Sequence, residues 1–420
     1  MATQLASPNL TMNRAFLLPM LAVLLAPQVT VSAQTAQPQQ TRRDYQSQRG
    51  GSGYTSVRST RIIQRRNPYA QPATPATPAI PVVPHNPYVQ QYGITNLSGT
   101  PNTLKTVSPQ QFPAATKSST KEKGYTYRDT LSVDGLKRTY NVHLPPGYRT
   151  NRSMPVVFCF HGLQLTGQLM MMISNFNSTA DKNGFVVVYP DGIGQAWDDG
   201  RNNRGYDDVG FVSAILQKLT TTVGIDRRRI YASGISNGGY FSQLLACAMP
   251  DKIAAIGVVG ATMMQQAASQ CHSSRPMPVM FFLGTSDPLI AWGDGNVRAP
   301  GDLGDLVGVS GIGSVDSAIA RYGGLLAVPE LINFWTTHNR CPSGTPYSST
   351  EPDRDPSDGT RVKKESFGSS NNEVVLYRIE GGGHTWPGGF PYAHASVAGK
   401  ISQDIDACDL MWQFFKNKSR

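Results

Sequence analysis

The sequence predicts an α/β protein with an open, mostly parallel sheet and helices on both faces. From about residue 125 onward, short apolar β-prone runs alternate with longer stretches of helical periodicity. The first two β-prone runs are joined by Asp134-Gly135, a typical hairpin turn. An opening hairpin followed by alternating strands and helices is typical of this architecture, whose functional groups lie at the carboxyl ends of the strands.

The predicted elements follow one another between residues 125 and 416. The β-prone segments are Tyr125–Val133, Arg138–Leu144, Pro155–Phe160, Phe185–Tyr189, Ile230–Ser233, Ala254–Val259, Val279–Leu283 and Glu373–Ile379. Helical periodicity marks Gln168–Lys182, Asp207–Thr222, Gly239–Met249, Pro329–His338 and Ser402–Lys416. The nearly three hundred residues from 123 to 420 suffice for one such catalytic domain.

A secretory signal peptide is predicted at residues 1–33. Arg14 precedes an apolar run over residues 15–26, and Val31-Ser32-Ala33 has the small residues of a cleavage site. We expect cleavage after Ala33 and a secreted or periplasmic protein. The apolar run is too short to span a bilayer, which argues against stable membrane insertion, with a membrane anchor as the alternative.

Residues 34–122 are rich in Gln, Pro, Ser and Arg and have no sustained apolar period, which predicts a disordered linker. From residue 34 to 124, seven arginines and four lysines stand against two acids, a net charge of +9 out of the chain's +10. This basic segment could contact anionic envelope surfaces, but a solvated tether is the favoured interpretation. The catalytic domain is close to neutral, and no nucleic-acid partner is expected.

All five cysteines (Cys159, Cys247, Cys271, Cys341 and Cys408) lie in the later domain, and none forms a C-x-x-C pair. An odd number leaves at least one without an intramolecular partner. Export permits disulfides, whose pairing the sequence leaves open. Cys159, inside an apolar run, is expected to be a buried free thiol.

The pentapeptide Gly234-Ile235-Ser236-Asn237-Gly238 has the G-x-S-x-G pattern of a nucleophile elbow. A β-prone segment precedes it and helical periodicity follows it, the order that an elbow requires. The flanking glycines leave room for a strained serine where strand and helix cross. The following helix would direct its first N–H groups at the oxygen that becomes negative in acyl transfer. Ser236 is therefore the expected nucleophile.

A serine nucleophile needs a base, and the base needs an acid that orients it. In the α/β-hydrolase arrangement the chain order is serine, acid, histidine. Asp287 follows the predicted strand 279–283 in a turn, which makes it the expected acid. Asp294 is the alternative, and the ordinary role of Asp287 would be to cap its own turn.

Three histidines, at 338, 384 and 394, follow Asp287. His384 comes after the predicted strand ending at Ile379, inside the glycine run 381–388, where a loop could bring the imidazole to the elbow. His338 falls in a predicted helix, as an ordinary surface residue would. We therefore expect His384 to be the base.

An oxyanion hole needs a second backbone N–H beside that of Asn237. His161-Gly162-Leu163-Gln164 follows an early predicted strand and fits the required loop. The N–H of Leu163 or Gln164 would point at the oxyanion, and we assign Leu163. Gly162 would allow a close backbone approach, while His161 precedes Ser236 and is expected to be structural.

Together these motifs make residues 139–420 resemble the secreted polyhydroxybutyrate depolymerase and feruloyl esterase family of α/β-hydrolases. Further stretches support it: Leu144-Pro145-Pro146-Gly147-Tyr148, Tyr189-Pro190-Asp191-Gly192, Trp197, Asp207-Asp208-Val209-Gly210-Phe211, Gly284-Thr285-Ser286-Asp287-Pro288 and Gly382-Gly383-His384-Thr385-Trp386-Pro387-Gly388. The resemblance implies a carboxylic ester hydrolase with the triad Ser236, Asp287 and His384, and without metal or other cofactor.

The sequence also departs from this family. Many members carry a cysteine where this chain has Leu163, and another where it has Phe367-Gly368-Ser369-Ser370, so their disulfides do not transfer. The glycine-rich stretch 293–324 is longer than usual and could form a lid or substrate rim. No appended polymer-binding domain is recognisable, which weakens the case for attack on solid polyester.

The sequence thus predicts a secreted serine esterase that acts through an acyl-enzyme on hydroxyacyl, feruloyl or acetyl esters, with polyhydroxyalkanoate depolymerase as the alternative. Trp197 and Trp386 could line an acyl pocket, although buried aromatic rings more often belong to the core. A serine peptidase is less favoured, because no propeller-like domain precedes the elbow. A non-catalytic carbohydrate- or envelope-binding protein is also less favoured, and acyl transfer to a sugar would use the same residues.

Overall fold

The computed structural model describes residues 124–200, 204–273, 275–288, 290, 292–293 and 324–420. The predicted signal peptide, the predicted linker, the alternative acid Asp294 and nearly all of the glycine-rich stretch lie outside the described residues. Those that are described belong to one compact unit, residues 72–420.

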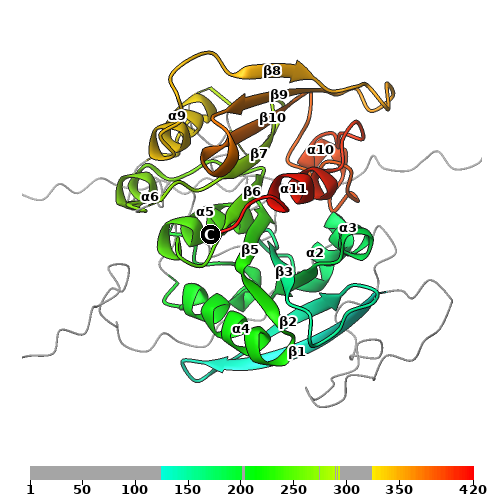
Figure 1. The fold of residues 1–420 in the computed structure, drawn as a ribbon. Coiled ribbons are helices and arrows are strands. Elements are labelled where there is room, and N and C mark those ends of the chain that lie inside the picture. Colours follow the sequence, from blue (N-terminus) through cyan, green and yellow to red (C-terminus); the bar gives the residue numbers. More distant parts are fainter. Residues whose placement is uncertain (1–123, 201–203, 274, 289, 291, 294–323) are drawn as a thin grey trace, which may run out of the picture. The chain divides into compact units, whose positions relative to one another are not determined.

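Ten strands form one sheet, in the order β1-β2-β4-β3-β5-β6-β7-β10-β9-β8 (Figure 1). The strands are β1 (Tyr125–Val133), β2 (Leu136–Leu144), β3 (Met154–Phe160), β4 (Val186–Pro190), β5 (Ile225–Ile235), β6 (Ala255–Val259), β7 (Val279–Gly284), β8 (Tyr347–Thr350), β9 (Arg361–Phe367) and β10 (Val374–Glu380). The central strands from β4 to β10 pair in parallel, whereas β1, β2, β8 and β9 pair antiparallel with their neighbours. The α/β-hydrolase fold predicted from the sequence is confirmed.

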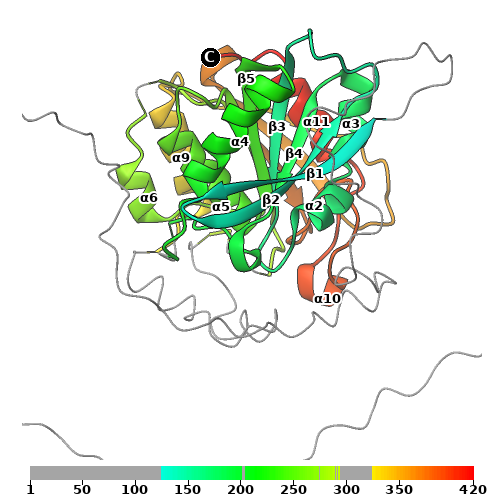
Figure 2. The ribbon, with the colours of Figure 1, turned by 90° about the horizontal axis from the view of Figure 1, so that it is seen from below.

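Helices cover both faces of the sheet. They are α2 (Gly167–Ser174), α3 (Phe176–Asn183), α4 (Asp208–Thr222), α5 (Asn237–Ala248), α6 (Gln265–Gln270), α9 (Val328–His338), α10 (Ala395–Ala398) and α11 (Ala407–Phe415), with short 3₁₀ turns η1 (Ile193–Gln195) and η2 (Ser370–Asn372). In Figures 1 and 2, α4, α5, α6 and α9 lie on one side of the sheet, and α2, α3 and α11 lie on the other.

Two hydrophobic clusters separate along the central strands. In β3, Val156, Phe158 and Phe160 join the cluster under α4, α5 and α9, while Val157 and Cys159 join the one under α2, α3 and α11. Successive side chains of a strand point to opposite faces, and in a sheet buried on both sides every position must be apolar. This is why β3 is a continuous apolar run.

Two predicted helices have different bounds. The helix predicted over 168–182 is broken at Asn175, whose φ of 54° ends α2 and whose N–H caps Met171. The helix predicted from residue 402 begins only at Ala407, because Asp406 has an extended backbone and its side chain accepts the Asp409 N–H as an N-cap. In both cases the apolar periodicity continues through a position where the backbone leaves the helix: a left-handed residue at Asn175 and an N-cap at Asp406.

The strands at the sheet margins were predicted unevenly. The hairpin at Asp134-Gly135 is confirmed, with φ of 50° and 76° at the two residues. The strands β8 and β9 were not predicted, because their sequences are polar and their side chains are mostly exposed or half-buried. The strand β5 starts at Ile225, before the start predicted at Ile230.

One disulfide, Cys247–Cys271, ties the end of α5 to the segment after α6. Cys159, Cys341 and Cys408 are free, and the expectation of a buried thiol at Cys159 is confirmed. Burial raises the pKa of the Cys159 thiol far above its ordinary value. No helix of the described residues is long and apolar enough to cross a membrane.

Candidate active site

Ser236 lies at the sharp turn between β5 and α5. Its φ of 54° and ψ of −122° are strained for a residue with a side chain. Its N–H donates to the carbonyl of Val259 at the end of the neighbouring strand β6, with an N–O distance of 2.9 Å. The strand, the turn and the helix follow in the order that the elbow motif predicts.

The glycines around Ser236 are sterically required. A Cβ on Gly238 would lie 2.3 Å from the Phe160 carbonyl oxygen, and one on Gly234 would lie 2.5 Å from the Gly238 carbonyl oxygen. Both distances are too short for any side chain, so the backbones of β3, β5 and α5 approach one another only because these residues are glycine. The close crossing presents the half-buried Ser236 at the carboxyl end of the sheet.

His384 and Asp287 are joined by a hydrogen bond of 2.8 Å between Nδ1 and Oδ2, and both side chains are almost completely buried. Asp287 follows β7 and His384 follows β10, the parallel neighbour of β7. The two loops are tied by the N–H of Ser286, which donates to the Gly382 carbonyl at 2.9 Å. Asp287 also accepts the N–H of Ile290 at 3.0 Å, which fixes the second carboxylate oxygen.

The His384 ring lies against Gly260, where an added Cβ would be 3.1 Å from ring atoms. Gly260 follows Val259, the residue whose carbonyl holds the Ser236 N–H. The end of β6 therefore contacts both the elbow and the imidazole, and Ser236 and His384 share this neighbour. Tyr392 donates its hydroxyl hydrogen bond to the His384 carbonyl and so helps to hold this loop.

Nε2 of His384 is buried and has no hydrogen-bond partner among the described residues. With Nδ1–H donating to the Asp287 carboxylate, a neutral imidazole carries its lone pair on Nε2 and can accept a proton there. Of the alternative histidines, His394 caps α10 and contacts Ser396. His338 also has a buried Nε2 without a partner among the described residues, but its Nδ1 contacts the Asn339 amide at the end of α9 and not a carboxylate.

The loop after β3 lies directly on the elbow. A Cβ on Gly162 would be 3.6 Å from the Ser236 Cβ, an ordinary contact, so the approach does not itself require glycine. Gln164 donates its N–H to the Gln195 carbonyl at 2.8 Å and is unavailable to an oxyanion. The N–H of Leu163 has no hydrogen-bond partner in the described part of the chain, and that of Asn237 stands in the first turn of α5.

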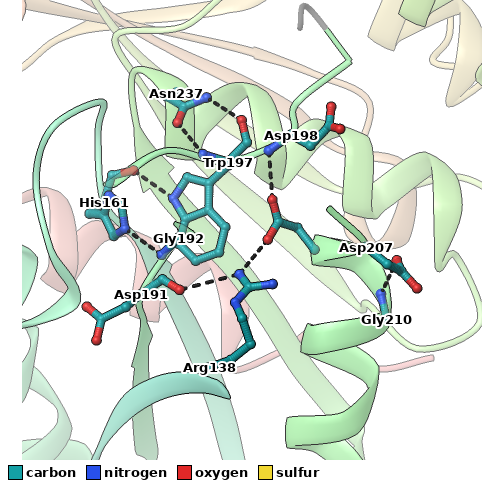
Figure 3. Close-up of polar contacts among 10 residues, drawn as sticks. Arg138, His161, Asp191, Gly192, Trp197, Asp198, Asp207, Gly210 and Asn237 are labelled. Atoms are coloured by element: carbon teal, nitrogen blue, oxygen red, sulfur yellow. Dashed lines mark hydrogen bonds and ion pairs between the residues drawn. The ribbon is translucent and has the colours of Figure 1, made fainter. Parts of the chain in front are cut away.

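His161 is structural, as its position before Ser236 suggested. Its Nδ1 lies 2.8 Å from the Gly162 carbonyl oxygen, and its Nε2 accepts the Gly192 N–H at 2.9 Å (Figure 3). These contacts fix a neutral ring protonated on Nδ1. Burial lowers the pKa of His161 to about 4.

A polar network that the sequence did not predict lies behind this loop (Figure 3). Arg138 and Asp208 form a fully buried ion pair with an Nη2–Oδ1 distance of 2.5 Å. The second Asp208 oxygen accepts the Asp198 N–H at 2.7 Å, and Arg138 also donates to the Asp191 carbonyl at 3.4 Å. Burial raises the pKa of Asp198 to about 6. Asp191 and Asp208 lie in motifs that carry the family resemblance, and this resemblance was the available signal.

Trp197 and Trp386 are both about 1% exposed. Trp197 stacks on Phe241 with 5.1 Å between ring centroids, in the cluster under α5, and Trp386 packs in the cluster on the other face of the sheet. Both rings thus have the core packing that was the alternative to a pocket-lining role. The described residues contain no group of three or more His, Cys, Asp or Glu side chains arranged to hold a metal ion.

Comparison with known proteins gives esterases. Residues 138–323 match the family model described as esterase PHB depolymerase. NocK of Nocardia uniformis subsp. tsuyamanensis, provisionally named an esterase, is 28% identical over 326 residues, 75% of this chain and 89% of that protein. Feruloyl esterase D of Neurospora crassa is 28% identical over 42% of this chain and 64% of its own length. Feruloyl esterase B of Piromyces equi is 28% identical over 37% of this chain and 30% of its own length.

The chain thus spans less than two thirds of these two feruloyl esterases. Among solved structures, the acetyl xylan esterase from Aspergillus awamori matches 61% of this chain and 94% of its own, with 13% identity and a TM-score of 0.42.

Proposed function

The domain that contains residues 138–323 belongs to the polyhydroxybutyrate depolymerase and feruloyl esterase family of α/β-hydrolases, and on this premise we propose a serine carboxylic ester hydrolase with the triad Ser236, His384 and Asp287. One observation carries the proposal. The buried His384–Asp287 hydrogen bond leaves Nε2 without a partner among the described residues, and the His384 ring lies against Gly260, just after the end of β6 that accepts the N–H of the strained Ser236. A base with an unused lone pair, held by a carboxylate near a strained serine, is what acyl transfer requires.

In this mechanism Nε2 of His384 takes the proton of the Ser236 hydroxyl as its oxygen attacks the ester carbonyl. Asp287 holds the ring in the tautomer with Nδ1–H and stabilises the imidazolium. The carbonyl oxygen becomes negative and accepts hydrogen bonds from the backbone N–H groups of Leu163 and Asn237. The imidazolium then gives its proton to the leaving alcohol, and the acyl group remains on Ser236. Water, activated by His384, hydrolyses this ester and regenerates the enzyme.

We propose hydroxyacyl, feruloyl or acetyl esters as substrates, with polyhydroxyalkanoate as the alternative. The names of the related proteins support the ester class and include both feruloyl and acetyl xylan esterases. The test is a panel of p-nitrophenyl acetate, methyl ferulate, a 3-hydroxybutyrate oligomer and a polyhydroxybutyrate film. Cleavage of methyl ferulate but not of the film would assign a feruloyl esterase, and film clearing would assign a depolymerase.

Ser236→Ala should abolish both hydrolysis and labelling by a fluorophosphonate probe. Ser233→Ala is the matched control, because Ser233 lies on the same strand and donates its hydroxyl to Met411 inside the core. This variant should retain labelling. A folded wild type that neither takes the label nor cleaves any ester would overturn the esterase proposal and favour the binding protein.

We also propose export, with residues 1–33 removed. The disulfide Cys247–Cys271 supports it, since disulfides persist in oxidising compartments. Mass spectrometry of the protein recovered from the periplasm or medium should give a mature chain that begins at Gln34 with this pair oxidised. A chain that keeps residues 1–33 and stays inside the cell would refute it. Contact of the basic segment 34–122 with anionic surfaces stays a prediction.

A further inference from the structure

The side chain of Asn237 is fully used in hydrogen bonds to one distant segment. Its Oδ1 accepts the Trp197 N–H at 2.7 Å, and its Nδ2 donates to the Trp197 carbonyl at 3.1 Å (Figure 3). Nδ2 also donates to Oδ2 of Asp199 at 2.6 Å. The amide is 3% exposed, and its two donors and its acceptor all have partners. Such a pairing fixes the backbone of Trp197 relative to the start of α5.

Trp197 carries this constraint to the loop after β3. Its indole Nε1–H donates to the His161 carbonyl at 3.0 Å. The indole ring is held in place by Phe241 of α5, on which it stacks, and by Phe160 of β3, whose centroid lies 5.2 Å away. The ring therefore sits between the two elements that bear the proposed oxyanion donors and cannot shift without displacing one of them.

The loop after β3 completes a closed circuit. His161 fixes its own loop by contact with the Gly162 carbonyl and by accepting the Gly192 N–H. Gly162 packs against the elbow: a Cβ added at Gly162 would lie 3.6 Å from the Cβ of Ser236. A continuous chain of contacts therefore links Asn237 to Trp197, Trp197 to the His161 loop, and this loop back to Ser236. Leu163 lies in this loop, directly after Gly162.

We propose that the Asn237 side chain is a positioning residue of the oxyanion hole: it sets the separation between its own N–H and the N–H of Leu163. The inference rests on the proposed serine esterase function and deepens it. Two donors stabilise an oxyanion only when both lie about 2.7–3.1 Å from it, and a shift of about 1 Å in a catalytic group costs up to 100-fold in rate. The backbone N–H of residue 237 survives any substitution except proline, so the side chain can be tested separately.

The test is Asn237→Ala, with Asn339→Ala as a matched control. Asn339 makes the same paired contact with a backbone, at 2.8 Å from the Met277 N–H and 2.6 Å to the Met277 carbonyl, but before β7 at the opposite end of the strands. Both variants lose a buried amide. Activity is measured per active site, titrated with a fluorophosphonate, together with the affinity for a trifluoromethyl ketone that forms a tetrahedral oxyanion on serine.

Asn237→Ala should lower kcat for p-nitrophenyl acetate about 10- to 100-fold with KM changed less than about threefold, and trifluoromethyl ketone affinity should fall by the same factor. Asn339→Ala should lower the melting temperature and leave both quantities per titrated site at the wild-type level. A variant that loses affinity for the transition-state analogue while KM stays nearly constant has lost positioning of the oxyanion donors. A variant that is only less stable would keep both values per titrated site.

Trp197→Phe covers the case in which Asn237→Ala does not fold, because it removes the indole N–H, together with the five-membered part of the ring, and keeps an aromatic ring in the core. It should show the same parallel loss on a smaller scale, about 5- to 20-fold. Wild-type kcat and inhibitor affinity per titrated site in the folded variants would overturn the inference and leave the esterase intact. A wild type with no label and no ester cleavage would instead refute the proposed function and, with it, the oxyanion role.

Discussion

Acidification should destabilise this domain through His161. The ring is completely buried, and its two nitrogens are occupied as one donor and one acceptor by Gly162 and Gly192. Protonation would place a charge in the core and turn the Nε2 acceptor into a donor facing the Gly192 N–H. Burial accordingly lowers the pKa to about 4 in the folded protein, against about 6.5 for an unfolded histidine.

A depressed histidine pKa means that the unfolded chain binds the proton more tightly. The stabilisation that a neutral His161 provides is complete above the unfolded pKa and is lost as the pH falls from about 6.5 toward about 4. With these two values, the free energy of unfolding falls by about 2 kcal/mol between pH 7 and pH 5, and by about 3 kcal/mol in the acid limit. Carboxylates also titrate in this range, so the contribution must be isolated by substitution.

The assay is urea unfolding followed by tryptophan fluorescence at pH 7 and pH 5. His161→Gln keeps an acceptor and a donor but cannot titrate, so its loss on acidification should be smaller than that of the wild type by about 2 kcal/mol. His394→Gln makes the same exchange at an exposed position and should follow the wild type. Equal losses in the wild type and His161→Gln, within about 0.5 kcal/mol, would refute the assignment of acid sensitivity to this ring.

Three further predictions concern stability and are read from urea unfolding at pH 7. Gly238→Ala should lower the free energy of unfolding by about 2–3 kcal/mol, because the new Cβ would collide with a backbone oxygen. Gly162→Ala is the control: its Cβ makes only ordinary contacts, so the free energy of unfolding should change by less than about 0.5 kcal/mol. Similar losses in both variants would contradict the steric argument. Arg138→Met should cost about 3 kcal/mol by leaving the buried Asp208 carboxylate unpaired, and adding Asp208→Asn should restore part of it; no recovery in the double variant would argue against charge burial as the cause. Replacing both cysteines of Cys247–Cys271 by serine should cost about 3 kcal/mol, since the bridge spans 24 residues, and an unchanged midpoint would contradict it.

The parts of the site that depend on short-range sterics could be predicted from the sequence. Gly234 and Gly238 are required because a Cβ at either would meet backbone atoms, and that requirement is written in the pentapeptide itself. Asp287 and His384 could be proposed because each follows an apolar run that becomes a central strand, and parallel strands end at the same edge of a sheet. Because β7 and β10 are neighbours in the sheet, the loops after them meet, and Asp287 and His384 can form their hydrogen bond.

Contacts between distant polar side chains could not be predicted in this way. Arg138 and Asp208 are 70 residues apart, and each would be an ordinary surface residue of its strand or helix if the other were absent. The edge strand β8 and its neighbour β9 were missed for a related reason, because a strand with polar side chains lacks the alternation that identifies it. The periodicity of apolar residues predicts which face of a helix or strand is buried. It does not predict which distant polar side chain pairs with a polar residue on that face.

The oxyanion hole combines both cases. The donors could be assigned from the elbow and from the loop after an early strand, but their separation depends on Asn237 and Trp197, which are 40 residues apart and joined by side-chain contacts. Gly238→Ala and Asn237→Ala change adjacent residues, yet the first disturbs the crossing of strand and helix and the second disturbs only the link to the distant loop. If the second lowers transition-state affinity while Ser236 still takes its label, the nucleophile is built locally and the oxyanion hole is built by the tertiary fold.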